Sequence, residues 1–271
     1  FIERIPLEAR DPQGEATFAA IRELLLRSSI GPESVVVAMD APLLAITTVP
    51  EGRKKAWRRV EHAFTAMRKG LDAAAPRDPG WAPVLQPGVP IPPRIRQLGE
   101  ALTSRLGFKA WMPQGESPNG RLFFETYPSG TLWMLRRQGG YLGLGAAELK
   151  SYKKLKGSTL SEDALEATVR RVLDPLALAF PHSSVWPDFV EALLRWMRRD
   201  PKLMCKGGFC GGKLLDDAID SALCLGAALS YTLGSAVAIV DHECPDDGHI
   251  LLPGIGFASF GNQYRTDQSE N

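Results

Sequence analysis

The residues best suited to chemistry are three aspartates in a short helical segment, 213–223. Asp217 and Asp220 are three residues apart and Asp216 and Asp220 are four apart, so a helix presents them on one face. Carboxylates this close repel one another, and a cation bound between them offsets the repulsion. A structural alternative is that acids near a helix N-terminus complement the helix dipole. It accounts for Asp216 and Asp217 but poorly for Asp220, a turn deeper, so the spacing favours a cation-binding role.

Two further acids lie at the ends of predicted strands. Asp40 closes the apolar run 34–40, which is typical of a central strand buried on both faces. Glu125 lies near the end of a second short strand, 121–128. Ligands of open α/β sheets bind where strands end and helices begin. Converging carboxylates suit Mg²⁺ or Mn²⁺, and two such ions stabilise both oxygens of a phosphodiester displacement.

The order of predicted elements places the chain in the α/β class. The predicted strands are 1–8, 34–40, 121–128, 235–240 and 248–253. The predicted helices are 14–29, 53–69, 94–106, 161–174, 185–199 and 213–233, with another beginning near 128. The last two strands either pair as a hairpin or join the main sheet. Residues 76–93 contain seven prolines and are predicted to be an insertion loop in a single domain, 1–255, followed by a tail, 256–271.

Basic residues cluster in three places that could contact phosphate. The predicted helix 53–69 carries an apolar stripe, and its other positions are rich in Lys and Arg. Its alternative is a solvated face around a core stripe. A second basic stretch covers 150–156, and Lys213 precedes the aspartates. The residues predicted to bind substrate are Arg53, Arg58, Arg59, Lys154 and Lys213.

The composition of the chain limits the kinds of partner and cellular compartment that can be expected. The 271 residues are 44% hydrophobic and 23% charged with a net charge of +1, so any nucleic-acid binding depends on a local patch. No apolar stretch is long enough to span a bilayer, and four cysteines are too few for a disulfide scaffold. A cytoplasmic protein with reduced thiols and no membrane partner is therefore predicted.

The glycine-rich segment before the aspartates matches two motifs imperfectly. Gly207 to Lys213 has the spacing of a phosphate-binding loop, but Leu214 replaces the magnesium-binding Ser or Thr, and no strand precedes it. The spacing of Cys205 and Cys210 is wrong for a zinc knuckle, and no second pair follows. A flexible entry to the helix is the favoured interpretation.

Several motifs in order resemble a widespread family of predicted nucleases with a ribonuclease H-like fold. The resemblance covers about residues 30–255, and the helix with acids three apart is also similar to the last helix of RuvC-type junction resolvases. Its motifs are Asp40-Ala-Pro-Leu, Phe124-Glu125-Thr-Tyr-Pro128, Lys153-Lys154-Leu-Lys-Gly157, Asp217-Ala-Ile-Asp220-Ser-Ala-Leu and Gly248-His-Ile-Leu-Leu-Pro253.

The resemblance implies a two-metal phosphodiesterase on a mixed sheet flanked by helices, with helical and proline-rich insertions. Asp40, Asp217 and Asp220 would bind Mg²⁺ or Mn²⁺, and Glu125 would be a fourth catalytic residue or orient other groups. The fold's first catalytic aspartate stands on its first strand, and this chain opens on a later one. We therefore expect about 15 to 35 residues before Phe1, a strand hairpin that carries this aspartate.

Two other classes of function stay open. A binding module could keep the fold and its acidic residues while acting through a protein or nucleic-acid partner. An ATP-handling relative is the third class, since actin-like ATPases share the core of the fold. Cleavage that is lost with EDTA and restored by Mn²⁺ would favour the nuclease. Partner binding that survives loss of Asp217 and Asp220 would favour the module.

Overall fold

The computed structural model describes the chain in segments, which form two compact units. The described residues are 15–27, 34–40, 60, 93–112, 120–134, 152, 159–180, 185–200, 203–206, 208–240 and 248–254. The helical unit holds the described residues of Pro128–Ser235 and Pro253–Asn271. The sheet unit holds those of Arg4–Tyr127 and Ala236–Leu252.

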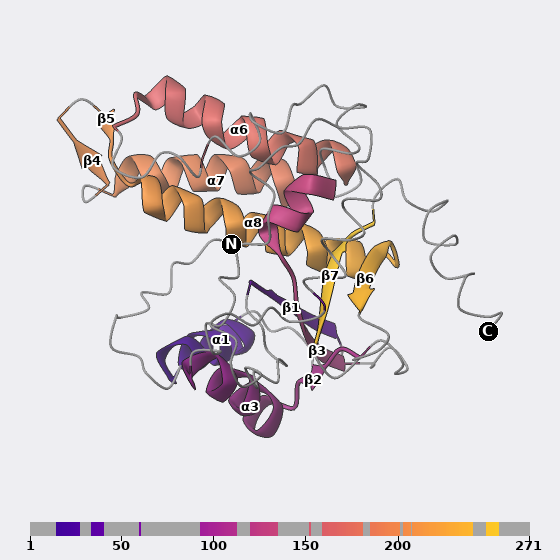
Figure 1. Ribbon diagram of the computed structural model, residues 1–271. Helices are drawn as coiled ribbons and strands as arrows, with labels where there is room; N and C mark the ends of the chain where they lie inside the picture. Colours follow the sequence, from indigo (N-terminus) through magenta and orange to yellow (C-terminus); the bar gives the residue numbers. More distant parts are fainter. Residues whose placement is uncertain are drawn as a thin grey trace, which may run out of the picture. The chain divides into compact units, whose positions relative to one another are not determined.

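The elements are those of an α/β protein with a small parallel sheet, so the predicted class is confirmed (Figure 1). The helices are α1 (Glu15–Arg27), α3 (Pro93–Leu106), α6 (Glu162–Ala179), α7 (Val185–Arg199) and α8 (Gly212–Thr232). The strands are β1 (Ser34–Met39), β2 (Lys109–Ala110), β3 (Gly120–Glu125), β4 (Met204–Cys205), β5 (Gly208–Phe209), β6 (Ala236–Val240) and β7 (His249–Pro253).

Several predicted segments lie outside the described residues. They are the strand 1–8, the proline-rich segment 76–93, the tail 256–271, and the basic helix 53–69 apart from Val60. Val60 is helical and fully buried, as expected for a residue of the apolar stripe.

In the sheet unit, β3 lies between β1 and β2 and runs parallel to both. The register pairs Val37 with Phe123 and Met39 with Glu125. Helices α1 and α3 lie side by side (Figure 1) and bury Phe18 and Leu102 in one core with Phe123. The periodic apolar residues of both helices and the apolar strands therefore form a layer of helices on a sheet.

The central position among these strands belongs to β3. Leu122, Phe123 and Phe124 are buried, whereas the side chains of residues 35–39 in β1 are only half-buried. The apolar run 34–40 predicted a strand buried on both faces, and β1 is less enclosed than that. Among the described strands, β3 is the one neighbour of β1, so β1 does not have the central position that its apolar run predicted.

Strands β6 and β7 pair with one another, and β7 also meets β3. Thr126, just after β3, forms a parallel bridge with Leu251, and its Oγ1 donates to the Leu251 carbonyl at 2.7 Å. Of the two alternatives left open by the sequence, the pairing of the terminal strands is confirmed, and one isolated bridge links this two-stranded sheet to the residue after β3.

The helical unit is built from α6, α7 and α8, in which α6 packs against both other helices (Figure 1). The buried face of α7 repeats at helical spacing and consists of Trp186, Val190, Leu193, Leu194 and Met197. A Cβ on Gly226 of α8 would lie 2.9 Å from the Leu176 side chain of α6, so the glycine permits a close approach of these helices. Truncating the fully buried Trp186 to Ala would cost about 3–5 kcal/mol.

Helix α6 continues past the predicted end near residue 174. Its N-cap is Ser161, whose side chain accepts from the Ala164 N–H. Pro175 lies inside the helix, yet a further turn follows, in which the Phe180 N–H donates to the Leu176 carbonyl at 3.0 Å. Pro175, Leu176 and Phe180 are all buried, so packing outweighs the hydrogen bond that proline removes.

Among the described helices, none has the length and apolar character to cross a membrane.

Candidate functional site

Helix α8 brings three aspartates into its second and third turns. Asp216 is buried, Asp217 is exposed and Asp220 is half-buried. The core side of the helix is set by Leu215 and Ile219, so Asp216 stands at the edge of the core and Asp217 faces away from it. The first turn contains no acid. Because the dipole effect fades within the first turn, the dipole alternative explains these acids poorly.

Lys213, in the first turn of α8, is the counter-ion of these acids. Its ammonium donates a short hydrogen bond to Asp217 Oδ1 and lies 3.7 Å from Asp216 Oδ2. Partial burial by itself lowers the pKa of Lys213. The hydrogen bond to Asp217 and the negative charges of the three aspartates raise it by more, so the pKa of Lys213 is above its ordinary value. The side chains of Lys213 and Asp217 are 64% and 54% exposed, so the pair is accessible to solvent and ions.

A tyrosine outside α8 orients the side chain of Asp220. The Tyr152 hydroxyl donates to Asp220 Oδ1 at 2.7 Å, and the tyrosine is fully buried. A buried donor orients the carboxylate, as outer partners do for metal ligands. No motif in the sequence pointed to this role. The one available signal was an aromatic residue within the basic stretch 150–156, where a purely solvated segment has no need of one.

In the sheet unit, the structure brings Asp40 and Glu125 to the same edge of the sheet. Met39, the residue before Asp40, is in register with Glu125, and the Thr126 N–H donates to the Met39 carbonyl at 2.9 Å. Because β1 and β3 are parallel, both acids lie at carboxyl ends of neighbouring strands, where ligands of α/β sheets bind. Glu125 is buried and Asp40 is exposed.

His249, near the same end of the sheet, is a buried residue of β7. It packs edge-on against Trp111, with ring centroids 4.8 Å apart. The histidines were weak candidates for catalytic residues in the sequence. The contact with Trp111 gives His249 a packing role.

The other predicted site residues fall into two groups. Arg53, Arg58, Arg59 and Lys154 lie outside the described residues. The convergence of Asp40 and Glu125 with Asp217 and Asp220 stays a prediction, since each pair belongs to a unit that is described by itself.

The α8 aspartates are chemically suited to a magnesium ion with few protein ligands. Within the described segments, no group of three or more His, Cys, Asp or Glu side chains could enclose a metal. Mg²⁺, however, usually keeps several waters and is held by one or two carboxylates together with substrate phosphates. Asp217, which is accessible, and Asp220, which is oriented by Tyr152, fit this requirement.

Comparisons of the chain with protein-family models, with curated proteins and with solved structures gave no match.

Proposed function

We propose that this chain is a Mg²⁺- or Mn²⁺-dependent nuclease with a ribonuclease H-like fold, which hydrolyses phosphodiester bonds by a two-metal mechanism. The observation that carries the proposal is the placement of the α8 acids. They begin one turn after the helix start, where the helix dipole no longer favours them, and Tyr152 orients Asp220. Acids that a helix does not need are best explained by a cation that they bind.

The sheet unit supplies separate support. Asp40 and Glu125 follow or end neighbouring parallel strands, at the edge where α/β proteins bind ligands. Glu125 is buried and Asp40 is exposed, so this edge offers one enclosed and one accessible carboxylate.

Lys213 has two roles in this proposal. Without a metal ion it neutralises Asp217, as its hydrogen bond indicates. Once a cation takes up the negative charge, the ammonium becomes free to bind a phosphate oxygen of the substrate. The bound ions would stabilise the attacking and leaving oxygens of the displacement. The chain's own contribution is to hold the carboxylates in place and to orient the phosphate.

A cleavage assay tests the proposal directly. Labelled single- and double-stranded DNA and RNA are incubated with the chain and Mg²⁺ or Mn²⁺, then with EDTA, then with excess Mn²⁺. Cleavage should stop with EDTA and return with Mn²⁺. Asp217→Asn and Asp220→Asn should each reduce the rate by more than the roughly 100-fold that loss of an outer partner costs. Asn at 220 can still accept from Tyr152, so the fold is preserved.

The matched control is Asp188→Asn, which removes an exposed carboxylate from the first turn of α7. It should cleave like the unchanged chain. Equal loss in the control and in the α8 variants, or metal-independent cleavage, would contradict the proposal.

The second candidate is a non-catalytic binding module with the same fold. Lys213 already neutralises Asp217, and the described segments contain no cluster of three metal-binding side chains. A module that binds a nucleic acid or a protein would not need such a cluster. Nucleic-acid binding that persists in Asp217→Asn and Asp220→Asn, without cleavage by the unchanged chain, would support it.

A further inference from the structure

Two exposed cysteines face one another across the hairpin that precedes α8. Strands β4 and β5 are antiparallel, with Cys205 paired to Gly208. Cys210 lies two residues beyond Gly208, so the alternation of side chains places Cys205 and Cys210 on the same face, in a diagonal pair. Both are free thiols.

Each sulfur reaches toward the opposite strand. Cys205 Sγ donates to the Gly208 carbonyl at 3.4 Å, and Cys210 Sγ donates to the Leu203 carbonyl at 3.4 Å. The side chain of Cys205 also raises the pKa of the Cys210 thiol by hydrogen bonding, with further contributions from burial and charge. The two thiols therefore lie near one another on this face of the hairpin.

The hairpin backbone holds this arrangement. Leu160 and Phe209 exchange two backbone hydrogen bonds of 2.7 and 2.8 Å, which adds a third strand segment beside β5. Gly208 has a φ of +134°, and a Cβ there would lie 2.1 Å from the Leu160 carbonyl oxygen. Only glycine fits at this position. On the other side of Cys210, a Cβ on Gly211 would lie 2.8 Å from the side chains of Leu203 and Phe209, so the entry to α8 is closely packed.

We propose that Cys205 and Cys210 form a redox modification site, which closes to a disulfide by exchange with a low-molecular-weight disulfide such as oxidised glutathione. The Cys205 thiolate attacks one sulfur of the reagent, breaks its S–S bond, forms a mixed disulfide and releases one thiolate. Cys210 then loses its proton and attacks Cys205 Sγ, which releases the second thiolate. Two protein thiols are oxidised and one reagent disulfide is reduced to two thiols, so electrons and atoms balance.

The surroundings assign the order of attack. The Thr159 hydroxyl lies 3.7 Å from Cys205 Sγ, where it can donate to a thiolate. The raised pKa of Cys210 keeps that thiol protonated until the second step. Cys205 is therefore the attacking thiol and Cys210 the resolving one.

The position of the pair gives the modification a structural consequence. Cys210 stands two residues before α8, whose first turn carries Lys213. A disulfide fixes the point at which the chain enters this helix, and cross-links stabilise a fold by restricting the unfolded chain. The oxidised chain should therefore melt at a higher temperature than the reduced one. This inference rests on the hairpin alone and does not depend on the proposed nuclease activity.

The test uses the full chain, reduced and then exposed to oxidised glutathione in the presence of EDTA, followed by intact mass and peptide mapping. The unchanged chain should lose the mass of two hydrogens, with Cys205 linked to Cys210, and dithiothreitol should reverse this. Cys210→Ser should instead keep a glutathione adduct on Cys205. In the unchanged chain, acid quenching at short reaction times should find the first glutathione adduct on Cys205, because the Cys210 thiol has the raised pKa only while Cys205 is present.

Cys224→Ala, which removes a buried thiol, is the matched control and should form the same disulfide as the unchanged chain. Melting curves of all variants show whether each is folded. A stable glutathione adduct on the unchanged chain would overturn the proposal, and so would a link from Cys205 or Cys210 to Cys244. An early glutathione adduct on Cys210 of the unchanged chain would overturn the assigned order of attack.

Discussion

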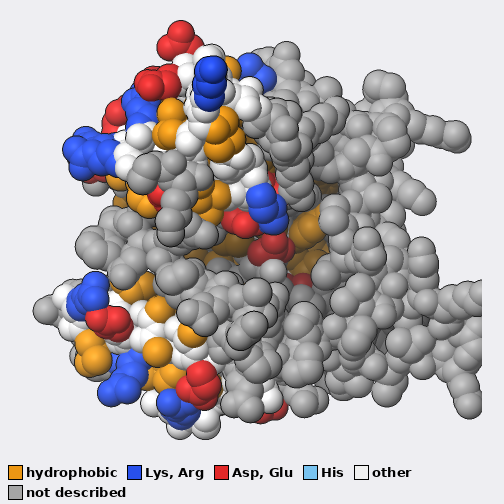
Figure 2. Space-filling view, turned by 90° about the vertical axis from the view of Figure 1, so that its left-hand side faces the viewer, with side chains coloured by type: hydrophobic (Ala, Val, Ile, Leu, Met, Phe, Trp, Pro, Cys, Tyr) orange, Lys and Arg blue, Asp and Glu red, His pale blue; other side chains and the backbone are white. Residues whose placement is uncertain are grey.

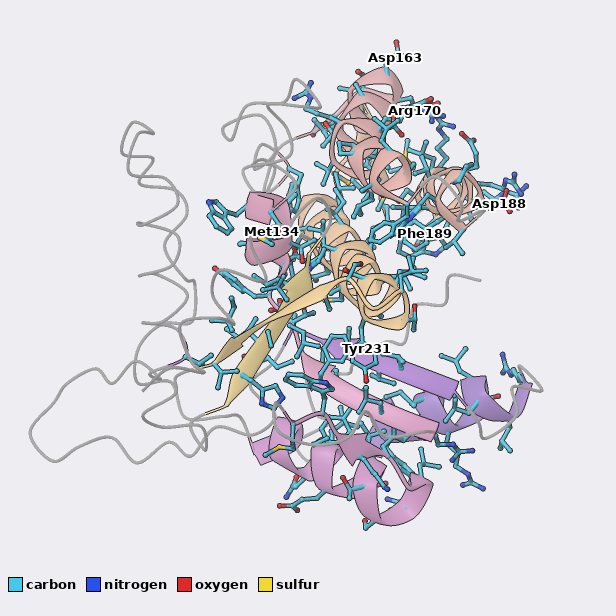
Figure 3. All side chains as sticks on the ribbon, turned by 90° about the vertical axis from the view of Figure 1, so that its right-hand side faces the viewer. Met134, Asp163, Arg170, Asp188, Phe189 and Tyr231 are labelled. Atoms are coloured by element: carbon cyan, nitrogen blue, oxygen red, sulfur yellow. The ribbon has the colours of Figure 1, made fainter. Side chains whose placement is uncertain are left out.

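The surface of α6 and α7 and the start of α8 both carry acids and bases, but they balance them differently. On α6 and α7, Glu166 lies 2.8 Å from Arg170 and 2.7 Å from Arg198, and Arg170 also lies 2.5 Å from Glu191. Acidic and basic side chains stand next to one another on the described surface (Figure 2), and Arg170 projects outward (Figure 3). The sequence of α8 has three aspartates and a single lysine, Lys213.

The proposed metal site predicts this difference. An exposed network of alternating sign needs no explanation beyond solvation and weak mutual attraction. In α8, three aspartates share one lysine within about two turns, and like charges this close repel one another. The comparison predicts that metal ions and substitutions act on the two regions in different ways.

The metal response should separate the regions most strongly. Mg²⁺ that binds only the folded chain stabilises it by about 2.7 kcal/mol at a hundredfold excess over Kd, which corresponds to several degrees in Tm. Asp220→Asn should abolish this gain and leave the metal-free protein at least as stable, because a repulsive charge is gone. Glu166→Gln should keep the gain. Thermal melts with and without Mg²⁺ measure both, and an unchanged response in Asp220→Asn would place the metal elsewhere.

Removing the Tyr152 hydroxyl, which orients Asp220, tests the α8 region through the partner of an aspartate. Tyr152→Phe deletes the donor to Asp220 and should lower the free energy of unfolding by about 1–3 kcal/mol, as for a hydrogen bond to a charged group. If Asp220 binds metal, Mg²⁺ affinity should also fall by roughly 10- to 100-fold. Urea unfolding and Mg²⁺ titration supply the two values. Tyr231→Phe, which removes a half-buried hydroxyl from α8, is the control for affinity and should leave it unchanged.

The two regions should lose stability at opposite ends of the pH scale. Hydrogen bonds from Arg170 and Arg198 hold the pKa of Glu166 below its ordinary value. A carboxylate with a lowered folded-state pKa stabilises above its unfolded-state pKa, and this contribution disappears as pH falls through the folded-state pKa. The raised pKa of Lys213 has the reverse effect: its contribution is present below the unfolded-state pKa and disappears as pH rises through the folded-state pKa.

Melting curves across the pH range check these signs. Glu166→Gln should match the unchanged chain in acid and be less stable at neutral pH, whereas Lys213→Met should match it only in strongly alkaline solution. A difference in Tm that stays constant with pH would mean that a substitution acts through packing and not through charge.

The smallest effect should come from the balanced network. Arg198→Met breaks the ion pair with Glu166 but keeps an apolar stem on α7. We expect Tm to fall by less than about 2 °C, and the difference should shrink at high salt because exposed pairs are screened. A larger fall that salt does not reduce would show that the network holds α6 and α7 together and is not merely a solvated surface.

Much of the local structure could be predicted from the sequence, because it depends on neighbours in the chain. The apolar period of 185–199 predicted α7, and the segment 213–233 matched α8 within one residue at each end. The acids Asp40 and Glu125 were expected at strand ends, where the structure has them, because each follows an apolar run that is typical of a strand.

Other features were decided only by tertiary structure. By its local effect on the backbone, Pro175 predicts the end of a helix. Helix α6 nevertheless continues beyond Pro175, where Leu176 and Phe180 are buried. The donor from Tyr152 to Asp220 joins residues 68 positions apart, and no spacing rule reaches that far. The thiols of Cys205 and Cys210 were judged by sequence spacing alone, whereas the strand register places them on one face of the hairpin as a diagonal pair. Sequence determines which side chains share a helix or strand face, but which distant side chains meet there is set by packing.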